Sequence, residues 1–383
     1  MPPESDAGAI LVTQPEALQA LAEQLLKQPV IAVDTESNSL YAYRERVCLV
    51  QFSTRELDYL VDPLALADLS PLAEVFASPR VEKVFHAADY DIICLKRDFG
   101  FKFNHLFDTM LAARILGREV FGLGNLLEIE FGVHQNKRFQ RANWGQRPLP
   151  ADQLEYARLD THYLIALRER LDVQLKDRGL ELLAQEDFAR MTLLEPNHQG
   201  TDNGSAAVWQ VRGAADLRPR AAAILAELCV YRDEAAQGMD RPLFKVIGDK
   251  TLIDIATNAP KTRRELGRIL GMTPGQLQRH GAALLQAVQK GLKAEPLIYP
   301  RPVRLSDAIL ARQDRLRVWR KEKGAHLGVP SDVVLPRDLM EALARRAPRT
   351  PLELAEMLHS VPYRRERFGA EIFALLEKKE KLS

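Results

Sequence analysis

The chain has 383 residues, of which 46% are hydrophobic and 27% charged, and its net charge of +1 is that of an ordinary globular protein with two or three domains. No apolar run approaches the ~18 residues of a membrane span, and the opening residues, MPPESDAGAI, lack the basic and apolar regions of a secretory signal. The three cysteines form no CxxC pair, which argues against a disulfide framework or a cysteine zinc site. We therefore expect a cytoplasmic protein without a membrane segment.

The first 190 residues alternate between strand and helix patterns. A helix is expected over 15–27, and short apolar runs predict strands at 30–34, 47–53, 57–61 and 81–85. A second helix is expected over 88–99. From Asp108, which we expect to be a helix N-cap, the pattern is helical and includes a long helix over 151–179. This order predicts an α/β domain in which helices flank a mixed sheet.

The segment EPNHQGTDNGSAA, residues 195–207, has the composition of a linker, because it is rich in small polar residues and has no apolar periodicity. We therefore place the α/β domain at 1–194. Beyond the linker almost everything is predicted to be helical, and we divide it into domains at 208–292 and 303–383.

The helical part contains an internal repeat. Residues 231–266 align without a gap on residues 319–354, at an offset of 88. Matched pairs include Arg232 with Arg320, Pro242 with Pro330 and Thr262 with Thr350. Registered prolines seldom match by chance, so we predict a duplicated helical module.

Charge is distributed unequally between the two halves of the chain. Residues 1–200 contain 21 basic and 30 acidic residues, whereas residues 201–383 contain 32 basic and 22 acidic ones. The basic half is a candidate for contact with a polyanion. Ordinary solvated helix faces are the alternative.

Two carboxylates end the first predicted strand. Asp34 and Glu36 follow the apolar run Val30–Val33 and lie two positions apart, so their side chains leave the strand on one face. A divalent cation would offset the repulsion between them. An Asp turn or N-cap followed by a solvated Glu is the simpler alternative.

Three further residues complete a candidate site. Asp89 follows the strand at 81–85 and opens a helix, where it could equally be an N-cap. Tyr156 and Asp160 are four residues apart on a predicted helix and so share a face. The alternative for Asp160 is a surface residue near Arg158 or His162.

Together, Asp-x-Glu at a strand end, a mid-chain Asp at a helix start and Tyr-x3-Asp on a late helix resemble the DEDD 3′→5′ exonucleases of the tyrosine subgroup. The stretch KRFQRANWGQRPLPADQLEYARLDTHYL and the two repeats, which resemble HRDC domains, narrow this resemblance to the ribonuclease D family. The resemblance implies an RNase H-like exonuclease domain at 1–194 followed by two HRDC-like domains.

The resemblance also implies a site and a substrate. Asp34, Glu36, Asp89 and Asp160 would hold two divalent cations, Mg²⁺ or Mn²⁺, and Tyr156 would orient the attacking water. Carboxylates suit these hard cations better than they suit zinc. The expected activity is release of nucleoside 5′-monophosphates from RNA 3′ ends, with 3′-tailed tRNA precursors as substrates. A monomer is favoured, but the sequence does not determine the oligomeric state.

Two other functions stay open. A proofreading-type DNA exonuclease uses the same acids and tyrosine, although no polymerase-sized region follows them here. A non-catalytic RNA-binding scaffold is the second, although all the acids are intact. A helicase is not expected, because the chain has no G-x4-GK-[ST] phosphate-binding loop.

Overall fold

The computed structural model describes residues 8–196, 208–300 and 304–377. These residues form two compact units that do not follow the order of the chain. The first unit comprises the residues up to Ser37, Val47–Pro196 and the residues from Arg304 onward, and the second comprises Asn38–Arg46 and Asn197–Val303. Most of the predicted linker, 195–207, lies outside the described residues. Within the described part of the chain, no helix has both the length and the hydropathy needed to cross a membrane.

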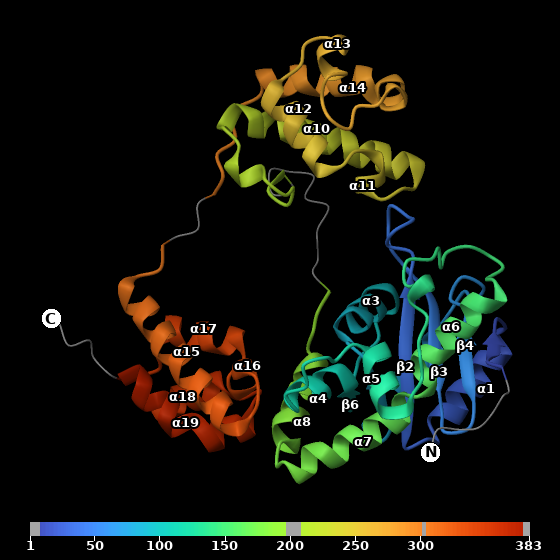
Figure 1. Cartoon of the computed structure of the whole chain (residues 1–383), viewed down its shortest axis with the longest axis vertical. Helices are drawn as coiled ribbons and strands as arrows, with labels where there is room; N and C mark the ends of the chain where they lie inside the picture. Colours follow the sequence, from blue (N-terminus) through green and yellow to red (C-terminus); the bar gives the residue numbers. More distant parts are fainter. Residues whose placement is uncertain (1–7, 197–207, 301–303, 378–383) are drawn as a thin grey trace. The chain divides into compact units, whose positions relative to one another are not determined.

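The mixed sheet predicted from the sequence lies at the centre of the first unit, and it has six strands (Figure 1). Its order is β1-β4-β3-β2-β5-β6. The strands are β1 (Ile10–Val12), β2 (Val30–Ser37), β3 (Val47–Ser53), β4 (Asp58–Val61), β5 (Glu82–Phe85) and β6 (Leu106–Asp108). The central strand β2 pairs antiparallel with β3 and parallel with β5.

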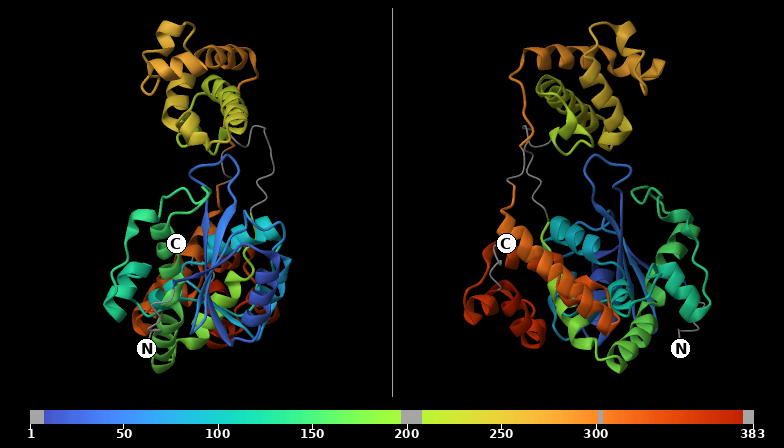
Figure 2. Two further views of the ribbon diagram at one scale, coloured as in Figure 1. Left: turned by 90° about the vertical axis from the view of Figure 1, so that its right-hand side faces the viewer. Right: turned by 60° about the vertical axis from the view of Figure 1, so that its left-hand side comes forward.

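Helices cover both faces of this sheet (Figure 2). Ile31 and Val33 pack into a cluster with α1, α2 and α3, whereas Val30 and Ala32 pack into another with α4, α7 and α8. Burial on both faces explains why β2 begins with four consecutive apolar residues. The helices are α1 (Pro15–Leu25), α2 (Ala73–Ala77), α3 (Asp89–Phe99), α4 (Thr109–Ile115), α5 (Leu123–Phe131), α6 (Ala151–His162), α7 (Leu164–Asp177) and α8 (Glu181–Met191).

The structure confirms the internal repeat. The first copy contains α10 (Pro219–Met239), α11 (Leu243–Val246), α12 (Asp249–Asn258), α13 (Arg263–Leu266) and α14 (Pro274–Lys293). The second contains α15 (Asp307–Leu327), α16 (Ser331–Val334), α17 (Arg337–Arg346), α18 (Pro351–Met357) and α19 (Pro362–Glu377). Each helix of the second copy starts 88 residues after its counterpart. Thr262 and Thr350 cap equivalent helices by accepting a hydrogen bond from the backbone three residues later.

The two copies belong to different compact units. The first copy forms the second unit together with residues 38–46, whereas the second copy shares a hydrophobic cluster with the α/β domain. Arg364 of α19 is fully buried and forms ion pairs with Glu186 and Asp187 of α8, at 2.9 and 2.8 Å. The second helical copy is therefore an integral part of the first unit.

Candidate active site

The C-terminal half of β2 carries two of the predicted site residues. Asp34 and Glu36 alternate with Thr35 along the strand, and so leave it on the same face. One carboxylate oxygen from each lies within 4.8 Å of the other and of an oxygen of Asp160. Acids separated by more than 120 positions in the sequence thus converge in space.

Helix α6 supplies Tyr156 and Asp160. It packs across β2, β3 and β4 (Figure 1), which places its inner face over the end of the central strand. The Tyr156 ring is buried beside Trp144 and Phe139, with ring centroids 6.2 and 5.8 Å away. Its phenol donates a hydrogen bond to the Asp160 carboxylate. The spacing of one helical turn therefore brings both groups into the same site.

The fourth acid of the site is Asp91, which corrects the choice of Asp89 made from the sequence. Asp89 is the first residue of α3 and is exposed, whereas Asp91 is on the buried face of that helix, 7% exposed. Thr35 of β2 donates a hydrogen bond from its hydroxyl to Asp91. Two residues along a helix correspond to a turn of about 200°, so the two carboxylates point in nearly opposite directions.

The acids perturb one another strongly. Burial raises the pKa of Asp34, and the neighbouring Asp91, Asp160 and Glu36 raise it further. Burial, together with Asp160 and Asp91, likewise raises the pKa of Glu36. The pKa values of Asp91 and Asp160 rise to about 7, again mainly because of burial. A bound divalent cation would offset this repulsion between the carboxylates.

The acids line a cavity of about 420 Å³. Its walls come from β2, α3, α6 and the segments around α5, and comprise Asp34, Thr35, Glu36, His86, Tyr90, Asp91, Gly122, Leu123, Gly124, Asn125, Gln135, Gln140, Tyr156 and Asp160. Sequence reasoning missed Gln135, which donates a hydrogen bond to Asp160 from its side-chain amide. It also missed His86 and Tyr90.

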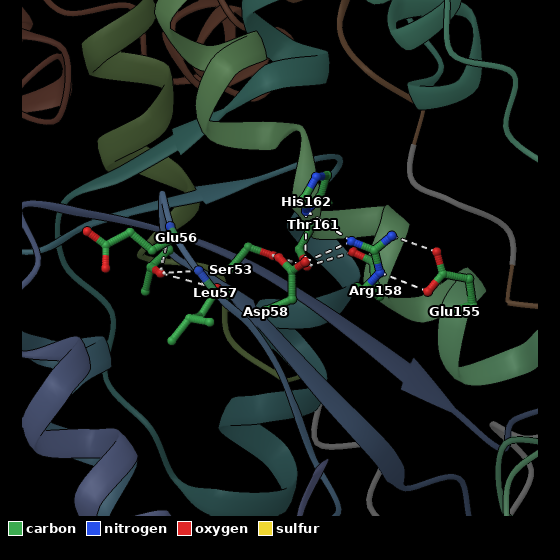
Figure 3. Close-up of polar contacts among 9 residues, drawn as sticks. Ser53, Glu56, Leu57, Asp58, Glu155, Arg158, Thr161 and His162 are labelled. Atoms are coloured by element: carbon green, nitrogen blue, oxygen red, sulfur yellow. Dashed lines mark hydrogen bonds and ion pairs between the residues drawn. The ribbon is translucent and has the colours of Figure 1, made fainter. Parts of the chain in front are cut away.

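A polar network behind α6 holds this helix on the sheet (Figure 3). Asp58 of β4 accepts hydrogen bonds from His162 Nδ1 at 2.7 Å, Arg158 Nη1 at 3.0 Å and Ser53 Oγ at 2.6 Å. The Ser53 hydroxyl also lies in hydrogen-bond contact with Thr161, at 2.7 Å. Burial alone would raise the pKa of Asp58, but these hydrogen bonds outweigh it and hold the pKa below its usual value.

Comparison with known families matches both parts of the chain. Residues 9–176 match a family described as 3′-5′ exonuclease, and residues 221–288 and 310–376 each match the HRDC domain. The chain is 30% identical over 354 residues to ribonuclease D of Pseudomonas paraeruginosa, in an alignment that covers 91% of this chain and 93% of the relative.

Other relatives are longer. The chain is 35% identical over 285 residues to protein RRP6-like 3 of Arabidopsis thaliana, which covers 69% of this chain but 32% of that protein. The chain spans between 32% and 52% of the length of the three Arabidopsis RRP6-like proteins that it matches.

The fold also matches a solved structure over nearly its whole length. The crystal structure of Escherichia coli RNase D, described as an exoribonuclease involved in structured RNA processing, superimposes with a TM-score of 0.70 at 25% identity. The match covers 97% of this chain and 99% of that one.

Proposed function

This chain belongs to the ribonuclease D family of 3′-5′ exoribonucleases, and on that premise we propose that its acidic cavity hydrolyses the terminal phosphodiester bond of RNA and releases nucleoside 5′-monophosphates. One observation carries the proposal. Oxygens of Asp34, Glu36 and Asp160 lie within 4.8 Å of one another, and Asp91 lines the same cavity. A bound cation would explain why the fold tolerates the repulsion between these acids.

The donor set fits hard divalent cations. Members of the DEDD exonuclease family depend on such cations, and four carboxylates match the oxygen ligands that Mg²⁺ and Mn²⁺ prefer. We propose Asp34, Glu36, Asp91 and Asp160 as the residues that hold two of them. When bound, the cations would supply charge neutralisation at the scissile phosphate and a more acidic water.

Tyr156 has a positioning role in this proposal. Burial and the neighbouring carboxylates raise its pKa well above the ordinary value near 10, so the phenol keeps its proton at neutral pH. A protonated phenol cannot act as a base, but it can donate a hydrogen bond. We therefore assign it the orientation of Asp160 and of the attacking water, and not the removal of a proton.

We propose tRNA precursors with short 3′ tails as the substrates. The Escherichia coli relative is described as acting in structured RNA processing, and the basic half of this chain offers phosphate contacts. The cytoplasmic location and the favoured monomeric state stay predictions from the sequence, which predicts no preference between Mg²⁺ and Mn²⁺.

A 3′-tailed tRNA and a DNA oligonucleotide of matched length test the proposal. The parent protein should shorten the RNA stepwise to 5′-monophosphates, and degrade the DNA more slowly. Chelation or the Asp34→Asn substitution should abolish shortening, since each removes part of the cation site. Undiminished trimming by Asp34→Asn would show that the active site is assigned to the wrong residues. Equal or faster degradation of DNA would favour the proofreading-type alternative, and cation-independent RNA binding without any degradation would favour the scaffold.

A further inference from the structure

The imidazole of His86 lies in a chain of hydrogen bonds that fixes which of its nitrogens donates and which accepts. His86 follows the last residue of β5 and lines the cavity with the acids. Its Nδ1 atom lies 2.9 Å from the hydroxyl oxygen of Thr109, and that hydroxyl donates to the backbone carbonyl of Phe85 at 3.0 Å. Thr109 is fully buried at the start of α4, so this chain of hydrogen bonds is shielded from water.

The hydrogen bonds determine which nitrogen of His86 carries the proton. A carbonyl can only accept, so the single hydroxyl proton of Thr109 points to Phe85. The Thr109 oxygen must then accept from His86, which places the imidazole proton on Nδ1. Burial also lowers the pKa of His86 to about 4, so the ring stays neutral. Nε2 is therefore a permanent acceptor.

Nε2 has room to receive a ligand. None of the described residues donates a hydrogen bond to Nε2. Nε2 is also not fully buried, so a ligand can reach it. The backbone around it is fixed, because Ala87 adopts a left-handed conformation with φ of 64° and the amide of Ala88 donates to the buried Asp108 carboxylate at 2.7 Å. The acceptor is thus held in place before a substrate arrives.

The chemistry of the cavity identifies the donor. Acids that hold cations are deprotonated and, like phosphate oxygens, can only accept hydrogen bonds. Neither the acids in that state nor the substrate phosphate can therefore donate to Nε2. The donor that every ribonucleotide carries and every deoxyribonucleotide lacks is the 2′-hydroxyl. We propose that Nε2 of His86 accepts a hydrogen bond from the 2′-hydroxyl of the 3′-terminal ribose and so makes the site prefer RNA 3′ ends. This inference rests on the proposed function.

Three RNA oligonucleotides of one sequence, ending in a ribonucleotide, a 2′-deoxyribonucleotide or a 3′-deoxyribonucleotide, test it. The parent protein should remove the terminal ribonucleotide with a kcat/KM roughly tenfold above that for the 2′-deoxy end, because Nε2 of His86 loses its hydrogen-bond donor. His86→Phe keeps a planar ring without an acceptor and should process both ends with the same kcat/KM. The 3′-deoxy end reports whether Nε2 reads the other hydroxyl instead.

Equilibrium binding gives a second readout that does not depend on turnover. Adenosine 5′-monophosphate should bind the parent about tenfold more tightly than its 2′-deoxy analogue, and His86→Phe should bind both equally. Thr109→Val, which removes the partner of Nδ1, should weaken the preference without abolishing it.

The possible outcomes separate this inference from the proposed function. If the parent trims RNA but does not distinguish the ribo end from the 2′-deoxy end, the role of His86 is wrong and the proposed function stands. The role of His86 is also wrong if His86→Phe keeps the full preference, or if only the 3′-deoxy end is discriminated. If the parent trims no RNA end at all, the proposed function itself fails.

Discussion

At the scale of single residues, the candidate site concentrates negative charge that the fold alone does not neutralise. Asp34, Glu36, Asp91 and Asp160 are brought together by strand alternation and by two helix faces. Thr35, Gln135 and Tyr156 each donate one hydrogen bond to an acid, and these neutral donors offset only part of the repulsion. The free energy of unfolding should therefore depend on pH and on divalent cations.

The metal-free protein should lose stability between about pH 4 and pH 7. Asp91 and Asp160 have pKa values near 7 in the folded protein and near 4 in an unfolded chain, so the folded state holds extra protons in that window. The stabilisation is complete below pH ~4 and is lost as the pH rises through about 7. Mn²⁺ should raise the melting temperature more at pH 8 than at pH 5.5, because ligands must deprotonate to bind. Calorimetry of the parent and Asp91→Asn checks this, and an unchanged pH profile in the variant would contradict it.

Residue identities in the site were partly predictable. Asp34, Glu36, Tyr156 and Asp160 stand at positions where strand or helix periodicity alone fixes their direction. The same periodicity would have selected Asp91, since it shares the apolar face of α3 with Ile92 and Leu95. Gln135 was not predictable, because it approaches Asp160 from an irregular segment whose path depends on tertiary packing.

At the scale of elements, the network centred on Asp58 fixes the position of α6. Asp58→Asn removes the negative charge of the carboxylate that both Arg158 and His162 contact. The side chains of Arg158 and His162 are 13% and 5% exposed. We expect a loss of about 1–3 kcal/mol in unfolding free energy and slower turnover, since α6 carries Tyr156 and Asp160. Glu155→Gln is the matched control, because it removes only the ion pair between Arg158 and the half-exposed Glu155. We expect it to lower the unfolding free energy by less than ~1 kcal/mol. Equal effects of the two substitutions in denaturation and turnover assays would refute this role.

A close helix crossing in the first repeat gives a separate prediction. A Cβ atom added at Gly291 of α14 would lie 2.4 Å from the Cα of Ile224 in α10, whereas one added at Gly238 of α10 would meet nothing within 4 Å. Gly291→Ala should destabilise this module by about 1–3 kcal/mol, and Gly238→Ala should stabilise it by up to ~1 kcal/mol. Hydrogen exchange of α10 and α14 in the full chain measures both. Similar protection in the two variants would contradict the close packing.

Prediction from the sequence succeeded for elements with a long periodic pattern and failed for the short strands at the edges of the sheet. The repeat was predictable because registered prolines and caps recur at one offset. The edge strands β1 and β6 were missed, because three residues are too few to show an alternation of apolar and polar side chains. These strands form because they pair in parallel with β4 and β5, respectively. The single helix expected over 151–179 instead divides at Tyr163 into α6 and α7. Its expected end near Gly179, which has a φ of 63°, agrees with the end of α7 at Asp177.

At the scale of the whole molecule, a buried ion network joins the second helical copy to the exonuclease domain. Arg364 donates to Glu186, Asp187 and the carbonyl of Val333. Arg364→Met removes the counter-charge of two largely buried acids and should cost about 3–5 kcal/mol of unfolding free energy in the first unit. The exposed neighbour Arg365 supplies the control, because Arg365→Met should change it by less than ~0.5 kcal/mol. Thermal unfolding compares the two, and equal melting temperatures would show that the network does not hold the copy in place.

Isothermal titration of Mn²⁺ into the parent, Asp91→Asn and Asp89→Asn proteins tests most directly whether Asp34, Glu36, Asp91 and Asp160 together bind two cations. We expect two bound ions in the parent and in Asp89→Asn, with similar affinities. In Asp91→Asn we expect one ion to be lost or bound at least about tenfold more weakly. Full binding by Asp91→Asn together with impaired binding by Asp89→Asn would contradict the account.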